Sequence, residues 1–228
     1  MKLSGEVLAG ASKFGHDFAA VNDFASAIAE IRNSGVELAI VVGGGNLIRG
    51  RDVKAFGLDP VNADSMGMLG TVMNAIALKD SIEKLGIRTD VYSAVRMEPI
   101  ADMYNRVRVN DSLKSGHVVI FGAGTGHPFF STDSAAALRA AEIGADCVVK
   151  ATKVNGIYDK DPEKFKDAKF LPELSFSDAL RLNIEVMDAA AFAICRDNKI
   201  PIWVLSVHEE NWQKKICSDS ENFGSLVR

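Results

Sequence analysis

The sequence predicts an α/β protein built around a largely parallel sheet. Two observations indicate this class: apolar runs of strand length recur along the chain, and stretches with helical periodicity separate them. Most of the runs are apolar on both faces, which is typical of parallel strands that helices cover on two sides. Because strand and helix alternate, we expect right-handed crossovers and helices on both faces of the sheet.

The first residues, MKLSGE, look like the end of a strand that runs into a turn. Only three residues precede Ser4, whereas a core strand usually has ~5–6. We therefore expect either a very short first strand or a chain start that is cut. The remaining strands are expected at residues 36–42, 87–94, 117–122, 145–151 and 201–207.

Helices are expected between these strands. In residues 20–34, Val21, Phe24, Ile28 and Ile31 share one face, and Gly35 follows as a stop. Residues 132–143 begin at a Ser-Thr-Asp cluster that suits a helix start, with Asp133 as the expected cap, and end before Gly144. Two further helices are expected at residues 175–182 and 187–198.

A longer helix is expected at residues 64–85, ending before Gly86. It carries five apolar residues that we expect on its core-facing side: Met66, Leu69, Val72, Met73 and Ile76. Methionines at such spacing, Met68 included, more often pack in a core than line a site. Residues 154–174 break the alternation, because they are rich in turn residues and charge, and they predict an ordered loop or short hairpin.

Composition excludes several classes of protein. The 228 residues include 47% hydrophobic and 25% charged ones, which is ordinary for a folded domain, and we expect one domain with two lobes. A net charge of −4 without a basic stripe argues against nucleic-acid binding. No apolar run is long enough for a bilayer, and we expect no signal peptide. Three widely spaced cysteines favour a reducing compartment, so we expect a cytoplasmic protein.

Three glycine clusters follow expected strands: Ser4-Gly5, residues 43–45 and residues 122–133. In open parallel sheets, ligands bind beyond the carboxyl ends of the strands. Glycine leaves backbone N–H groups free to face an anion, and Arg49 follows close behind the second cluster. Tight turns use glycine anyway, but three clusters at strand ends favour phosphate binding. The spacing matches neither a P-loop nor a dinucleotide fingerprint, and no histidine spacing suggests a resident metal site.

Single side chains carry less weight. Lys2 stands where it could reach a phosphate, although a terminal lysine is usually solvated. Asp64 and Asp133 could each be a charge at a helix start, and Asp161 could belong only to a turn. Of the adjacent Phe129 and Phe130, at most one can pack beneath the loop, so the other is a candidate ligand contact.

Six segments together resemble the bacterial UMP kinases of the amino-acid-kinase superfamily. They run in family order and cover almost the whole chain: KLSGE (2–6), GGGNLIRG (43–50), DSMGMLGTVMNAIAL (64–78), GTGHPFFSTDSAA (124–136), KATKVNGIYDKDP (150–162) and VMDAAAF (186–192). The Pro-Phe-Phe stretch, together with the Met-Gly-Met-Leu segment, is specific to UMP kinases within the superfamily.

The resemblance implies a three-layer αβα sandwich and the reaction ATP + UMP → ADP + UDP, with Mg²⁺, in de novo pyrimidine nucleotide synthesis. It implies a UMP-binding lobe at about residues 1–144 and an ATP-binding lobe at about residues 145–228. It further implies a homohexamer that GTP activates and UTP inhibits.

The resemblance also assigns roles by position. Those on the ATP side are Lys2, Leu3, Ser4, Gly5, Gly45, Arg49, Thr152, Tyr158 and Asp161. Those on the UMP side are Gly44, Asp64, Thr125, Gly126, His127, Pro128, Phe129, Phe130, Ser131 and Thr132. Lys2, Arg49 and Asp133 would serve the transfer itself, with Asp133 orienting charged groups around the phosphoryl. The GTP region would be Gly10, Ala11, Ser12, Lys13, Phe14 and Gly15.

His127 departs from the family, which most often has asparagine there. Two other functions stay open. One is a kinase of the same superfamily that acts on a carboxylate or carbamate. The other is a non-catalytic protein that stores a nucleotide or oxyanion on this fold.

Overall fold

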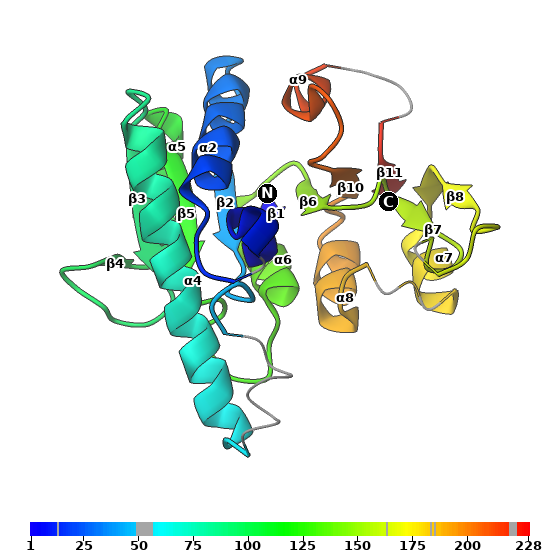
Figure 1. The fold of residues 1–228 in the computed structure, drawn as a ribbon, viewed down its shortest axis with the longest axis horizontal. Coiled ribbons are helices and arrows are strands. Elements are labelled where there is room, and N and C mark those ends of the chain that lie inside the picture. Colours follow the sequence, from blue (N-terminus) through cyan, green and yellow to red (C-terminus); the bar gives the residue numbers. More distant parts are fainter. Residues whose placement is uncertain (13, 49–56, 163, 183, 185, 219–222) are drawn as a thin grey trace.

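The computed structural model describes residues 1–12, 14–48, 57–162, 164–182, 184, 186–218 and 223–228. Within these residues, nine strands form one twisted sheet (Figure 1). They are β1 (Lys2–Leu3), β2 (Ala39–Val42), β3 (Thr89–Ser93), β4 (Asp102–Met103), β5 (Val118–Gly122), β6 (Val148–Thr152), β9 (Glu173–Leu174), β10 (Ile202–Ser206) and β11 (Ser225–Val227).

The strand order is β4-β3-β5-β2-β1-β6-β10-β11-β9, so the two-residue β1 lies near the middle of the sheet. All of the recorded strand pairs in this sheet are parallel except β10 with β11. The sequence-based prediction of a mainly parallel sheet is therefore confirmed. The carboxyl ends of β5, β2, β1, β6 and β10 meet at one edge of the sheet.

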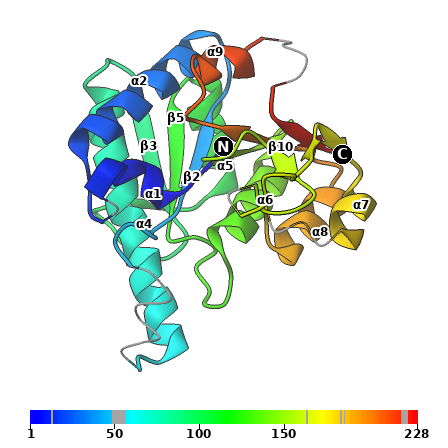
Figure 2. The same cartoon turned by 45° about the vertical axis from the view of Figure 1, so that its right-hand side comes forward.

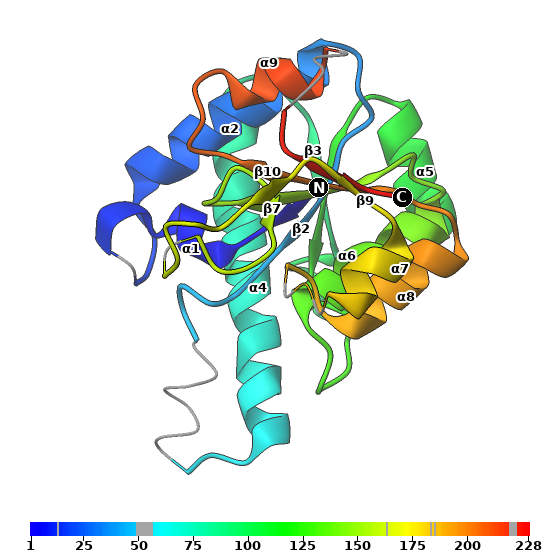
Figure 3. The same cartoon turned by 90° about the vertical axis from the view of Figure 1, so that its right-hand side faces the viewer.

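Helices cover both faces, and with the sheet between them they make three layers (Figure 3). One layer contains α1 (Gly5–Leu8), α2 (Phe18–Asn33), α4 (Pro60–Glu83) and α9 (Trp212–Ile216). The other contains α5 (Arg106–Lys114), α6 (Thr132–Ile143), α7 (Phe176–Arg181) and α8 (Ala189–Asp197). A short 3₁₀ helix, η1 (Gly10–Ser12), follows α1. The expected helices all form, whereas α5 has too weak an apolar pattern and was missed.

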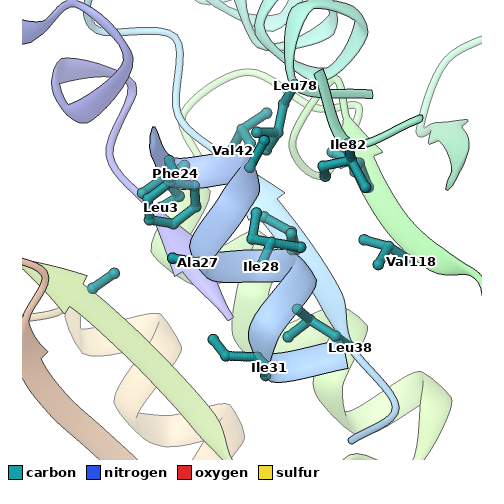
Figure 4. Packing of buried hydrophobic residues seen from close by; sticks show 14 of the residues in the cluster. Leu3, Phe24, Ala27, Ile28, Ile31, Leu38, Val42, Leu78, Ile82 and Val118 are labelled. Atoms are coloured by element: carbon teal, nitrogen blue, oxygen red, sulfur yellow. The ribbon is translucent and has the colours of Figure 1, made fainter. Parts of the chain in front are cut away.

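The core lies on both sides of the sheet because side chains alternate along each strand. In β2, Ile40 and Val42 face α2 and α4, while Val41 faces α6 and its neighbours. The predicted core face of α2 is confirmed, since Val21, Phe24, Ile28 and Ile31 are all buried. Figure 4 shows the packing of this first cluster, with the α2 side chains against Leu3, Val42, Leu78, Ile82 and Val118.

The predicted core face of α4 is wrong. Met66, Leu69, Met73 and Ile76 are all more than a third exposed, and of the predicted five only Val72 is buried. The side that packs on the sheet carries mostly small and polar residues instead: Gly70, Thr71, Val72, Asn74, Ala75, Leu78, Ser81 and Ile82. Small residues are needed there because the glycine-rich turn after β2 crosses this helix at close range. The N-terminal half of α4 projects beyond the sheet (Figure 2).

Residues 154–174 contain the predicted hairpin. β7 (Ile157–Tyr158) and β8 (Phe170–Leu171) pair antiparallel as a separate two-stranded sheet. The rings of Tyr158 and Phe170 meet edge to face across the pair, with centroids 5.5 Å apart. In the part of the chain that the structure describes, no helix combines the length and the apolar character needed to cross a membrane.

Candidate active site

The three glycine clusters converge at the carboxyl edge of the sheet. Ser4 and Gly5 follow β1, residues 43–45 follow β2, and residues 123–131 connect β5 to α6. Because β5, β2 and β1 are consecutive in the sheet, the loops that follow them are neighbours. The sequence-based prediction that these clusters share one edge is confirmed.

Two glycines are required by close packing. A Cβ atom on Gly5 would lie 2.4 Å from Asn46 Oδ1 and 2.7 Å from the Gly43 carbonyl. A Cβ atom on Gly44 would lie 2.7 Å from the Gly67 carbonyl in α4. A Cβ atom cannot lie this close to another atom. The turns after β1 and β2 can therefore pack this closely against each other and against α4 only because Gly5 and Gly44 have no side chain.

Two buried asparagines hold these turns in place. Asn74 Nδ2 donates to the Gly43 carbonyl at 2.7 Å and to Asn46 Oδ1 at 2.7 Å. Asn46 Nδ2 donates in return to Asn74 Oδ1 at 3.1 Å and to the Gly15 carbonyl at 2.7 Å. His16 Nε2 lies 2.7 Å from Asn74 Oδ1. This network ties the glycine turns to the segment at residues 10–16, and the sequence analysis did not find it.

A buried charge cluster lies beside the turn after β1. Lys150 Nζ donates to both carboxylate oxygens of Asp133, at 2.6 and 2.5 Å. Lys2 Nζ lies 3.0 Å from Asp133 Oδ1. The three side chains are only 10–14% exposed. Two ammonium groups thus share one carboxylate, which leaves a net charge of about +1 at the strand ends, where a phosphate would be attracted.

Burial lowers the pKa of Lys150 to about 8, with a further lowering from the neighbouring charge of Lys2. The contact with Asp133 acts in the opposite direction, because a negative charge favours the ammonium form. Lys150 is therefore largely protonated at neutral pH and loses its charge in the mildly alkaline range.

The sequence analysis missed Lys150. Its signal was present, since it is a charged residue inside a strand that is otherwise apolar. A lysine in such a strand needs a partner. The structure supplies one through register: Lys2 of β1 pairs directly with Lys150 of β6, so both side chains leave the same face of the sheet toward α6.

Asp133 is not the cap of α6, as the sequence analysis expected. Ser131 is the N-cap, and its Oγ accepts hydrogen bonds from the backbone N–H groups of Asp133 and Ser134. Since Ser131 satisfies the helix end, the Asp133 carboxylate is available for the two lysines. Asp64 likewise does not lie in the first turn of α4, because this helix begins at Pro60 and Asp59 is its N-cap.

Asp188 links this helix start to α8. It accepts hydrogen bonds from the hydroxyls of Ser131 and Ser134, the latter at 2.8 Å, and from the backbone N–H of Ala191 at 2.8 Å. Burial alone would raise the pKa of Asp188, but these hydrogen bonds outweigh it and hold the pKa below its usual range. Asp188 therefore stays ionised and fixes the helix that carries Asp133.

A cavity of about 160 Å³ opens between α4 and the loop after β5. Six residues expected on the UMP side line it, together with Gly45: Gly44, Asp64, Thr125, His127, Phe130 and Thr132. Gly126, Pro128, Phe129 and Ser131 lie in the same loop. The structure thus brings the expected UMP-side residues to one place.

Asp64 also holds the loop itself. The backbone N–H of Phe129 donates to Asp64 Oδ2 at 2.7 Å, and Phe129 has a positive φ of 68°. The rings of Phe129 and Phe130 are 74% and 56% exposed, so neither packs beneath the loop. Phe130 lines the cavity, and an exposed aromatic ring there is suited to contact with a flat, partly apolar group.

Of the residues expected on the ATP side, Ser4 and Gly5 follow β1, and Thr152, Tyr158 and Asp161 lie at or after the end of β6. Ser4 is the N-cap of α1. Thr152 ends β6, and its Oγ1 donates to the Val154 carbonyl at 2.8 Å, which shapes the turn that leads to Tyr158 in β7. Asp161 follows on the surface, 3.0 Å from Lys164 Nζ.

The expected GTP region forms η1 and the turn after it. Phe14 is 69% exposed, and Gly15 exchanges backbone and side-chain hydrogen bonds with Asn46. Two expected residues, Arg49 and Lys13, lie outside the described residues.

Comparison with known proteins gives consistent matches. A family model described as the amino acid kinase family matches residues 1–206. A crystal structure of a UMP kinase from Bacillus anthracis superposes with a TM-score of 0.95 at 34% identity, covering 100% of this chain and 93% of that one. A UMP kinase from Ureaplasma parvum gives 0.93 at 34% identity, covering 99% and 96%. A uridylate kinase from Archaeoglobus fulgidus gives 0.75 at 26% identity, covering 100% and 99%.

Proposed function

The chain belongs to the amino acid kinase family, and we propose that it is a UMP kinase that transfers the γ-phosphoryl group of ATP to UMP. A phosphate oxygen of UMP attacks the γ-phosphorus, and the bond from that phosphorus to the β,γ-bridging oxygen breaks. ADP leaves with the electron pair, and UDP carries the new bond. The fully ionised UMP phosphate is already a nucleophile, so the transfer needs no general base and releases no proton.

One observation carries the proposal: adjacent residues join the cavity to the charge cluster. Thr132 lines the cavity between α4 and the loop after β5. The next residue, Asp133, holds Lys2 and Lys150. An acceptor phosphate bound at Thr132 is therefore one residue along α6 from the carboxylate that holds both ammonium groups. Catalysis by positioning and charge neutralisation is what phosphoryl transfer requires.

The roles of single residues follow from this arrangement. Lys2 donates to the transferred phosphoryl, assisted by backbone N–H groups at Gly5 and Gly45, and Asp133 orients Lys2. Asp64 and the loop at residues 124–132 hold UMP, with Asp64 on the ribose. On the other side, Thr152, Tyr158 and Asp161 hold adenosine, and by family resemblance Arg49 joins the ATP phosphates.

Mg²⁺ enters this proposal as part of the substrate, bound to ATP. Within the described residues, no group of three or more His, Cys, Asp or Glu side chains could hold a metal ion by itself. Mg²⁺ is commonly held by substrate phosphates and water with few protein ligands. When bound, the ion supplies charge neutralisation on the phosphates.

An ADP-release assay tests the function. The purified chain with Mg-ATP receives UMP, CMP, glutamate, carbamate or no acceptor. We expect rapid ADP release with UMP and much slower release with every other addition. Equal release with a carboxylate or carbamate would favour another kinase of the superfamily. Tight nucleotide binding without turnover would favour the storage protein.

The family resemblance supports further proposals about context. We propose a role in de novo pyrimidine nucleotide synthesis in the cytoplasm, which three free cysteines support. We propose a homohexamer, supported by the exposed apolar side chains of α4, among them Leu69 and Met73. Activation by GTP and inhibition by UTP are supported by the hydrogen bonds between Gly15 and Asn46, which connect residues 10–15 to the turn after β2.

A further inference from the structure

We propose that Lys150 is a positioning residue for phosphoryl transfer: it holds the Asp133 carboxylate, so that Lys2 keeps N–H groups available for the transferred phosphoryl. This inference rests on the proposed function.

Geometry is the first argument. Lys150 bonds to both oxygens of Asp133, whereas Lys2 makes one longer contact of 3.0 Å to a single oxygen. An ammonium group has three N–H donors. With one of them turned to Asp133, Lys2 retains donors for an incoming phosphate. Lys150 thus holds the Asp133 carboxylate, and Asp133 in turn orients Lys2.

Charge is the second argument. Without Lys150, Lys2 and Asp133 would form an isolated buried pair with no net charge. Such a pair attracts an anion weakly, and the carboxylate would compete with the phosphate for the Lys2 donors. With Lys150 present, the cluster carries one net positive charge in a site that is nearly closed to solvent. This positive charge stabilises the transferred phosphoryl group, whose charge is redistributed in the transition state.

The cluster predicts a pH dependence. The charged groups around Lys150 are Lys2 on β1 and Asp133 on α6, and Asp188 lies in a cavity that Asp133 also lines. On β10, the partner of Lys150 is the apolar Val204. Since burial lowers the pKa of Lys150 to about 8, its charge is present below that pH and is lost as pH rises through it. The phosphate group of UMP stays fully ionised there, because phosphate monoesters have a second pKa of about 6.

The test compares kcat and KM for UMP and ATP in the wild type, Lys150→Met and Lys150→Arg, from pH 7 to pH 9.5. For the wild type we expect kcat/KM to fall as pH rises through about 8, since this parameter reports ionisations of the free enzyme. Lys150→Met should lower kcat by about 10- to 100-fold at pH 7 and change KM for UMP and for ATP by less than about threefold. It should also abolish the decrease of kcat/KM above about pH 8. Lys150→Arg should restore part of kcat and move the fall to higher pH, because arginine stays protonated.

Two controls separate positioning from structure. Lys84→Met removes a lysine from an exposed ion pair with Asp80 on α4, and it should leave kcat unchanged. Asp133→Asn should lower kcat, and adding Lys150→Met to it should cost little more, because both act through one carboxylate. Melting temperatures are measured for all variants. If Lys150→Met does not fold, the comparison of the wild type with Lys150→Arg carries the test through the position of the alkaline fall.

The outcomes are distinct. A wild type without UMP-dependent ADP release overturns the proposed function and this inference with it. An active wild type whose kcat is within twofold of that of Lys150→Met overturns only the inference. Fully additive effects of Asp133→Asn and Lys150→Met, or an alkaline fall that Lys150→Arg leaves in place, also overturn it.

Discussion

Removing the amide of Asn74 should destabilise the whole fold. Truncation to alanine takes away the donor to the Gly43 carbonyl and to Asn46 Oδ1, and the acceptor that faces Asn46 Nδ2 and His16. Asn74 and Asn46 are both fully buried. Each buried polar group left without a partner costs about 1–3 kcal/mol. Two such acceptors, less up to ~0.7 kcal/mol for the better helix propensity of alanine, give a loss of roughly 3 kcal/mol.

For a chain of this length, 1 kcal/mol corresponds to about 2–4 °C in melting temperature. Asn74→Ala should therefore melt about 6–12 °C below the wild type in differential scanning calorimetry. The matched control is Asn62→Ala, which truncates an exposed asparagine near the start of the same helix and should change the melting temperature by less than about 2 °C. If the two variants melt together, the asparagine network does not support the glycine turns.

Four further predictions concern single residues. Lys2→Met should lower kcat by about 10²-fold with little change in UMP affinity, and an unchanged kcat removes Lys2 from the mechanism. Asp64→Ala should raise KM for UMP and spare KM for ATP; equal weakening of both would indicate a purely structural role. His127→Asn should keep the preference for UMP over CMP, because the loop backbone is fixed by its own turns; a tenfold relaxation, about 1.4 kcal/mol, would show that the side chain reads the base. A maleimide at pH 8 should label the exposed Cys217 first and Cys195 last, because burial raises the pKa of Cys195 to about 11 and keeps it a thiol; equal rates would contradict the burial.

Much of the geometry of the candidate active site could be predicted because its segments are local in sequence. The glycines at 43–45 and the loop at residues 124–132 directly follow apolar strands, and parallel strands place their carboxyl ends together. Roles that depend on helix boundaries were less predictable. Asp133 and Asp64 were both expected at helix starts, but Ser131 and Asp59 act as the caps, since a cap depends on which side chain bonds back to the helix end.

The sequence by itself determined the alternation of strands and helices, the glycine-bearing edge of the sheet and the family resemblance. Each depends on short-range pattern, because burial on one or both faces leaves its period in neighbouring residues. Only the tertiary structure decided which side of α4 faces inward and where Lys150 points. The turn after β2 approaches α4 closely at Gly67 and Thr71, and the exposed Met66 and Met73 lie away from this side of the helix. Lys2 and Lys150 share Asp133 because β1 and β6, far apart in the chain, are adjacent in one register. No local pattern records that register, since it is set by the packing of the whole sheet.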